Sequence, residues 1–187
     1  MKRTLSLMLA LVMAVSLMAC GKKDDGKNNA DAPADSLALL TKVWDSYTDD
    51  EKFPAAGGDY ETSVDDAPGA FDPSNADNLN FLLTVPTEDA SLIDDAASLM
   101  HMMNANTFTC GALRVKNGDD AAKLAEDLLD AIQNKQWMCG FPDKLVILTY
   151  GQYVVSLYGA EDLVDTFRDK FTAAYGDSVV AYDEAIL

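Results

Sequence analysis

Residues 145–158 read LVILTYGQYVVSLY, and this stretch decides the expected fold. The runs 145–150 and 153–158 are rich in β-branched and aromatic residues, which predicts two strands. Gly151-Gln152 lies between them, and glycine in the first position of a two-residue loop favours a type II′ turn. We therefore expect a β-hairpin in which Tyr150 lies opposite Tyr153.

Both faces of this hairpin are apolar. We expect helices to cover the face formed by Val146, Leu148, Tyr150, Tyr153, Val155 and Leu157. The opposite face carries Leu145, Ile147, Val154 and Tyr158, with Thr149 and Ser156, and is too apolar to be left in water. Either the segment 37–85 covers it, or these four apolar residues form an interaction surface for a partner protein.

Further strands and helices are expected on both sides of the hairpin along the chain. Residues 98–105 and 107–115 have the pattern of strands, and 119–137 and 160–175 carry apolar residues at helical spacing. The order β-β-α-β-β-α predicts an α+β fold, a mostly antiparallel sheet with helices packed on one face. Residues 37–187 are expected to form this single domain.

An N-terminal helix and an irregular segment are expected to precede that unit. Residues 37–47 form an amphipathic pattern after Asp35 and Ser36, both suitable N-caps. Residues 48–78 are rich in Asp, Gly, Ala and Pro, so the segment is either disordered or functional. Residues 79–85 favour a short helical turn, and 179–187 leave open whether an edge strand is added.

Residues 1–19 have the pattern of a targeting segment. Lys2 and Arg3 precede the apolar run 5–18, which at about 1.5 Å per residue is too short to span a bilayer and fits a secretory signal peptide. Residues 21–36 read GKKDDGKNNADAPADS and lack large apolar side chains, which predicts a disordered tether.

The signal segment ends in Leu17-Met18-Ala19-Cys20-Gly21, which resembles the lipobox of bacterial lipoproteins. That resemblance implies diacylglycerol on Cys20, cleavage before it, and a lipid anchor on the extracytoplasmic face of the cell membrane. The alternative is an ordinary secretion signal with an incidental cysteine. Two acyl chains would make the anchoring stable.

Charge excludes several classes of partner. The 187 residues hold 14 basic and 31 acidic side chains, a net charge of −17. Nucleic-acid binding needs clustered Lys and Arg, so we expect no nucleic-acid partner. The same charge disfavours adsorption on anionic lipid headgroups, which leaves lipidated Cys20 as the expected contact with the membrane.

From about Ser98 to Phe171 the chain resembles the lipoprotein family called domain of unknown function 4358. The matching features are Met102-Met103-Asn104 on a strand, Arg114 to Gly118 after the next strand, the helix that follows, and the hairpin. The resemblance implies an envelope location in a Gram-positive, gut-type anaerobe. The family has no established activity, so it transfers no catalytic residue.

Few residues in the sequence are candidates for catalysis or metal binding. The sequence contains one histidine, His101, and none of the metalloprotease, nucleophile-elbow, P-loop or dinucleotide motifs. Cys110 and Cys139 form a disulfide or remain buried thiols. His101 beside Cys110 is the only candidate for a nucleophile and its base.

Two further patterns leave alternatives open. Residues 72–78 supply oxygen ligands loosely like the start of a calcium loop, but lack its glycine and its distal glutamate. The run Leu99 to Met103 is rich in methionine, which suits core packing, a soft interaction surface or a thioether metal site.

We therefore expect a membrane-anchored extracytoplasmic lipoprotein that is a non-enzymatic interaction or binding module of the cell envelope. An envelope protein is the expected partner, and we predict no cofactor, metal ligand set or catalytic residue. One alternative is a small-ligand or calcium-binding lipoprotein. A second alternative is a small hydrolase.

Overall fold

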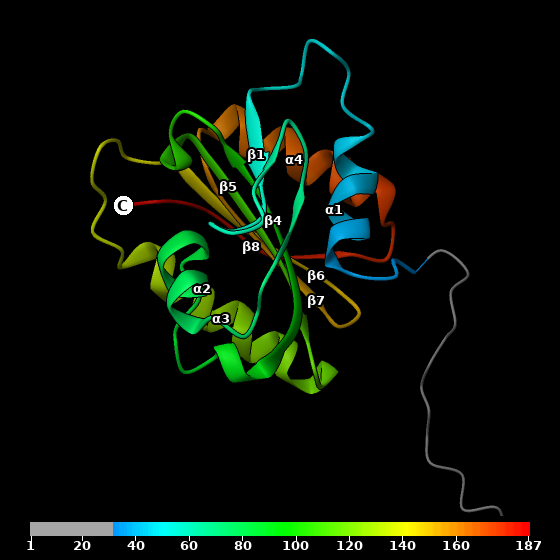
Figure 1. The fold of residues 1–187 in the computed structure, drawn as a ribbon, viewed down its shortest axis with the longest axis vertical. Helices are drawn as coiled ribbons and strands as arrows, with labels where there is room; N and C mark the ends of the chain where they lie inside the picture. The colour runs from blue at the N-terminus through cyan, green and yellow to red at the C-terminus, as the bar shows by residue number, and fades with distance from the viewer. Residues whose placement is uncertain (1–31) are drawn as a thin grey trace, which may run out of the picture. The chain divides into compact units, whose positions relative to one another are not determined.

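The computed structural model describes residues 32–187 (Figure 1). The expected signal peptide, the lipidation of Cys20 and most of the expected tether lie outside the described residues. Pro33–Leu187 form one compact unit. Within the described part, no helix combines the length and the apolar character needed to cross a membrane.

An antiparallel sheet of eight strands organises this unit. Its order is β2-β1-β4-β5-β7-β6-β8, and β3 pairs with β4 beside this path. The strands are β1 (Ala55–Gly57), β2 (Val64–Asp65), β3 (Gly69–Phe71), β4 (Ile93–His101), β5 (Phe108–Val115), β6 (Lys144–Tyr150), β7 (Tyr153–Gly159) and β8 (Val179–Ala185). The sheet and its helices make the fold α+β, as predicted.

The hairpin predicted from residues 145–158 is present as β6 and β7. Tyr150 pairs with Tyr153, which is the predicted register. Gly151 has φ of +57° and Gln152 does not have a positive φ, the combination that a type II′ turn requires. The open question about the C-terminal residues is also answered, because β8 pairs with β6 at the edge of the sheet.

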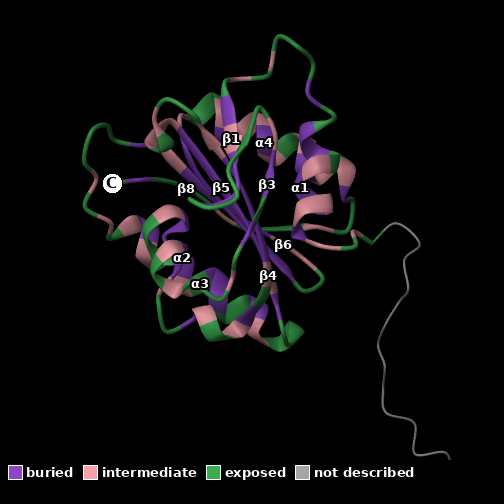
Figure 2. Cartoon of the chain, in the orientation of Figure 1, coloured by how far each residue is buried: buried purple, intermediate pink, exposed green. Residues whose placement is uncertain are grey.

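In the described residues, four α-helices cover the sheet: α1 (Ser36–Trp44), α2 (Ala76–Leu83), α3 (Ala121–Gln133) and α4 (Glu161–Ala174). Short 3-10 turns occur at Ala90–Leu92, Ala105–Thr107 and Gly118–Asp120. The helices α1 and α4 share one apolar cluster with one face of the sheet. The helices α2 and α3 share a second cluster with the other face. Figure 2 shows the central strands largely buried between these layers.

The expectation that the helices pack on one face is therefore wrong, and strand order explains why. The helix α3 connects β5 to β6, and α4 connects β7 to β8, each connection passing over one intervening strand in the same direction along the sheet. Because β5 and β7 run antiparallel, two right-handed crossovers in that direction must lie on opposite faces. The sequence does not show that β7 inserts between β5 and β6.

The N-terminal segment is ordered more fully than its composition suggested. Asp35 caps α1 by accepting a hydrogen bond from the backbone N–H of Ala38, at 2.7 Å. The body begins before residue 37, because the backbone N–H of Ser36 donates to Asp95. Residues 48–78 supply the short strands β1, β2 and β3, whose pairing ends on β4. The segment is therefore an extension of the sheet.

Candidate functional site

The four apolar residues proposed as an interaction surface are buried. Leu145, Ile147 and Val154 are fully covered and Tyr158 is 2% exposed. They belong to the apolar cluster that includes α2 and α3. The prediction of a partner-binding face here is wrong, because this chain's own helices already cover it. The alternative prediction, that the segment 37–85 covers this face, is only half right. The helix α2 lies on this face, but α1 packs on the opposite one.

The expected pair Cys110 and Cys139 does not form a disulfide. Both are free thiols, the first buried and the second exposed. Cys110 lies within β5, on the face covered by α1 and α4. Cys139 lies in the loop between α3 and β6, with φ of +62°. The structure places one thiol inside the core and the other in solvent, so the two do not meet.

Cys110 also lacks the surroundings of a nucleophile. Burial raises the pKa of its thiol, which disfavours the reactive thiolate. Its partner across the strands is Leu99 rather than His101. The His101 ring stacks on Phe53 at 5.7 Å between ring centres, and its Nδ1 accepts the backbone N–H of Met103. Nothing in this geometry supports a cysteine-based hydrolase.

A set of exposed apolar side chains gathers on two loops at one end of the sheet. The loop between β4 and β5 carries Met102 and Met103, and the loop between α3 and β6 carries Met138 and Phe141. Their exposed fractions are 45%, 79%, 78% and 59% respectively. We call these four residues the apolar pole.

Two asparagine side chains tie the loops of the apolar pole together. Asn104 donates to the carbonyl oxygen of Cys139 at 3.0 Å. Asn106 donates to the carbonyl oxygens of Met138 at 2.7 Å and Gly140 at 3.0 Å. Three consecutive carbonyl groups of one loop are thus held by the other loop. The exposed methionines therefore stand on a fixed backbone platform.

The apolar pole lies at the opposite end of the sheet from the point where the chain enters the body. Phe108 pairs with Gly159 at the pole end of the strands. At the other end, the carbonyl oxygen of Pro33 accepts from the hydroxyl of Tyr153, which begins β7. A strand of seven residues spans about 23 Å. Figure 1 shows the first described residues and these two loops on opposite sides of the body.

Acidic residues border the apolar pole without taking part in it. Asp143 lies two residues after Phe141, and its carboxylate accepts the backbone N–H of Glu161. Within residues 32–187, Asp143, Glu161 and Asp162 make no ion pair. This rim therefore keeps its negative charge.

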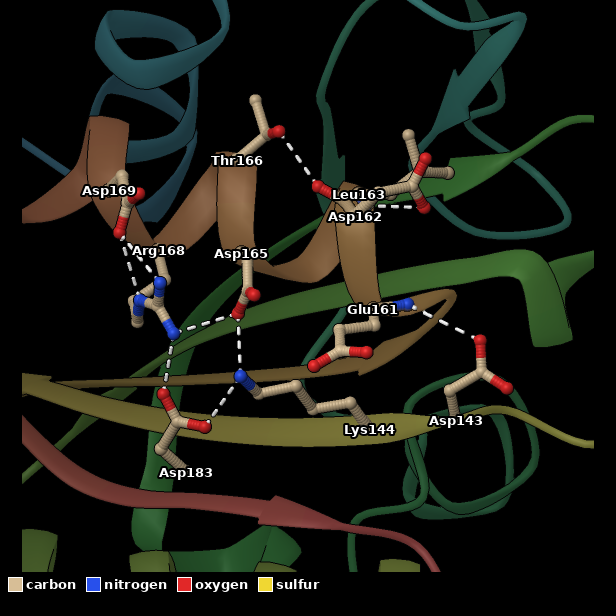
Figure 3. A network of polar contacts seen from close by, with 10 residues as sticks. All are labelled: Asp143, Lys144, Glu161, Asp162, Leu163, Asp165, Thr166, Arg168, Asp169 and Asp183. Carbon is tan, nitrogen blue, oxygen red and sulfur yellow. Dashed lines mark hydrogen bonds and ion pairs between the residues drawn. The ribbon is translucent and has the colours of Figure 1, made fainter.

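Beside that rim, a network of ion pairs joins β6, α4 and β8 (Figure 3). Lys144 contacts Asp165 at 2.6 Å and Asp183 at 2.7 Å, and Arg168 contacts both of the same carboxylates. Lys144 is 13% exposed at its side chain. The two cations of the network balance the two carboxylates that they share. The network also links the edge strand β8 to α4, so its role is structural.

The acidic loop that resembled a calcium site is used for local capping. Asp72 accepts the backbone N–H of Ser74, and Asn75 caps α2 by accepting the N–H of Asn78. The buried Asp59 also accepts the backbone N–H of Asp72. Among residues 32–187, no three His, Cys, Asp or Glu side chains are grouped as a metal site.

Asp89 is a buried carboxylate beside α3. Its side chain is 4% exposed and contacts Lys123 at 2.6 Å, and Lys123 also pairs with Asp127. Burial raises the pKa of Asp89, and the Asp127 charge adds to this effect despite Lys123. These groups line a surface cavity of about 350 Å³. Lys123 bridges the two carboxylates, so the cluster holds α3 against the loop before β4.

Reasoning from the sequence identified the methionines at 102 and 103 but missed Met138 and Phe141. One available signal was the distribution of charge. The chain has 31 acidic residues, yet 96–113 and 131–142 contain none. These two acid-free stretches supply both loops of the apolar pole.

Family models, curated proteins and solved structures were compared with this chain, and none of them gave a match. The resemblance to the domain of unknown function 4358 therefore stays a prediction from the residues quoted above.

Proposed function

We propose that this chain is a non-enzymatic interaction module of the cell envelope, anchored by a lipid on Cys20, that binds a partner protein through the apolar pole. The observation that carries the proposal is the exposure of four large apolar side chains on two tied loops. Exposed apolar clusters of this kind mark interaction sites on soluble domains.

Charge defines the chemistry of the partner. Residues 33–187 hold 28 of the 31 acidic side chains and 9 of the 14 basic ones. The apolar pole is acid-free but has an acidic rim. A complementary partner surface therefore presents apolar side chains surrounded by Lys and Arg. Such a partner would be attracted by the whole body and oriented by the rim.

The position of the apolar pole on the body is compatible with anchoring through the N-terminus. The chain enters the body at the end of the sheet opposite the apolar pole. A body held from its N-terminal side can therefore present the apolar pole to molecules beyond the membrane surface. The net negative charge of the body disfavours insertion of the methionines among anionic lipid headgroups, which favours a protein partner.

The test is cross-linking in cells followed by pull-down and mass spectrometry. The expected result is a repeated partner that is lost with Cys20→Ala and with the double variant Met103→Asp, Phe141→Asp. Val179→Asp is the matched control, because Val179 is 58% exposed but pairs with Thr149 at the other end of the sheet.

Two results would overturn the proposal. One is recovery of the same partner, in equal amounts, from the double variant and from wild type. The other is the absence of any enriched protein from wild-type cells. Raising the ionic strength should also weaken a genuine complex, because the rim and a basic partner attract one another through solvent.

A further inference from the structure

Four sulfur-bearing residues lie on the two tied loops. Met102 and Met103 directly precede Asn104, and Met138 and Cys139 supply two of the carbonyl groups that the asparagines bind. All four side chains are exposed. Residues separated by more than 30 positions in the chain are thereby fixed next to each other at the backbone, with flexible thioether side chains above it.

The four sulfur atoms of this set are soft ligands, and the side chains that carry them have almost no charge. Thioether and thiolate ligands select Cu(I), whereas carboxylate and carbonyl oxygens suit Ca²⁺ and Mg²⁺. All four sulfur residues lie in the acid-free stretches 96–113 and 131–142, and Asp143, at the end of the second loop, uses its carboxylate to accept the backbone N–H of Glu161. The set therefore discriminates against hard divalent cations by ligand type.

Cys139 adopts a backbone conformation that needs support. Its φ of +62° is unusual for a residue with a side chain, and Gly140 follows it with φ of +130°. The hydrogen bonds from Asn104 and Asn106 hold this turn in place. The turn leaves the Cys139 thiol in solvent instead of turning it into the core.

Nearby His101 and Cys110 are not suitable as further ligands. The Nδ1 atom of His101 accepts the Met103 N–H at 3.3 Å, so its lone pair is already used within the chain. Its ring also packs on Phe53. Cys110 is fully buried. The available donors are therefore three thioethers and one thiol.

We propose that Met102, Met103, Met138 and Cys139 form a binding site for a soft monovalent metal ion, Cu(I). Binding forms metal–sulfur bonds to the methionines and to the Cys139 sulfur. The thiol proton leaves to solvent, and no electron is transferred. The metal ion would then be held by flexible side chains that stand on a fixed backbone.

The experiment is a titration of the full chain carrying Cys20→Ala, in detergent and without oxygen, with Cu(I) and with Ag(I) as a redox-inert probe. Native mass spectrometry measures how many ions bind, and a competing chelator measures affinity. The expected result is one ion per chain, and weaker binding of Zn²⁺ and Ca²⁺.

Matched variants test the ligands. The double variant Met103→Leu, Met138→Leu and the single variant Cys139→Ser should each weaken binding about tenfold or more. Met100→Leu, on the half-buried part of β4, is the control and should leave binding unchanged. Failure to bind either ion, or equal affinity in all variants, would overturn the proposal.

The same variants separate this inference from the proposed function. Cys139 is a proposed metal ligand but is not part of the apolar pole. Cys139→Ser should therefore weaken metal binding and still capture the partner, whereas Met103→Asp, Phe141→Asp should lose the partner. The experiments can thus refute the proposed metal site and the proposed protein interface independently.

Discussion

Gly57 and Gly69 let two segments of the extended sheet approach closely. A Cβ atom on Gly57 would lie 2.1 Å from the backbone nitrogen of Gly69, and a Cβ on Gly69 would lie 2.4 Å from that of Gly58. Both contacts are with backbone, which cannot rotate away as a side chain does. The strands β1 and β3 depend on the absence of side chains at these positions.

Replacing Gly57 by alanine should therefore destabilise the fold. We expect Gly57→Ala to lower the free energy of unfolding by about 2–4 kcal/mol, because the backbone must shift to admit one methyl group. Gly176→Ala is the control, since no heavy atom lies within 4 Å of its Cβ position. Urea unfolding measures both, and equal midpoints for the two variants would contradict this account.

The two described cysteines should differ in reactivity. We expect iodoacetamide to modify Cys139 in the folded protein and to modify Cys110 only after unfolding, because burial raises the pKa of the Cys110 thiol and blocks access. Peptide mass spectrometry identifies the modified residue. Modification of Cys110 at the same rate as Cys139 under native conditions would show that the β5 face opens readily.

Among the elements, the edge strand β8 depends on charge more than on apolar burial. Most of its residues are exposed, and Asp183 connects it to Lys144 and Arg168. Burial alone would raise the pKa of Asp183, but hydrogen bonds from both cations outweigh it and lower the pKa. The ionised form of Asp183 is thus favoured in the folded state.

This shift makes a contribution to stability that depends on pH. Since the folded pKa is depressed, the contribution is complete above the unfolded value, about 4, and is lost as pH falls through the folded value. We expect Asp183→Asn to cost about 1–2 kcal/mol at neutral pH, a modest amount because the side chain is partly exposed. The cost should shrink below about pH 4.

Urea unfolding at several pH values measures that cost, and hydrogen exchange of residues 179–185 locates it. Asp177→Asn is the control, because Asp177 is exposed and is not in the network. A cost for Asp183→Asn that does not change with pH would rule out the ionised carboxylate as its cause.

At the scale of the whole molecule, the sheet is covered on both faces by the chain itself. The helix α1 contributes Leu39, Leu40 and Val43 to the cluster that it shares with α4. It lies far in sequence from the strands it covers. The segment Ser36–Trp44 is therefore part of the folded core.

Removing core volume from α1 should affect the whole body. We expect Leu40→Ala to lower the free energy of unfolding by about 2–5 kcal/mol, since Leu40 is fully buried and the cavity cannot collapse completely. Leu187→Ala is the control, because Leu187 is 98% exposed. An effect of Leu40→Ala no larger than the control would show that α1 is dispensable.

Local patterns were sufficient for the elements with strong periodicity. The hairpin register, the helices α3 and α4 and the cap at Asp35 follow from neighbouring residues, since turn chemistry and amphipathic spacing act over short distances. Residues 48–78 lacked such periodicity, and β1 to β3 are only two or three residues long. Their pairing on β4 could not be predicted from composition.

Only half of the candidate site could be predicted from the sequence, for a related reason. The methionines at 102 and 103 stood out in the sequence, whereas Met138 and Phe141 became relevant once Asn104 and Asn106 joined the two loops. These hydrogen bonds connect residues more than 30 positions apart. No periodicity within either loop reports such a contact.

The sequence by itself determined the acidic charge, the hairpin, most of the helices and the α+β class, because these depend on composition and short-range patterns. Only the tertiary structure decided which face each helix covers, that Leu145, Ile147 and Val154 are buried, and that the apolar pole exists. The reason is strand order. Placing β7 between β5 and β6 sends the crossover helices to opposite faces and brings the two sulfur-bearing loops to the same end of the sheet.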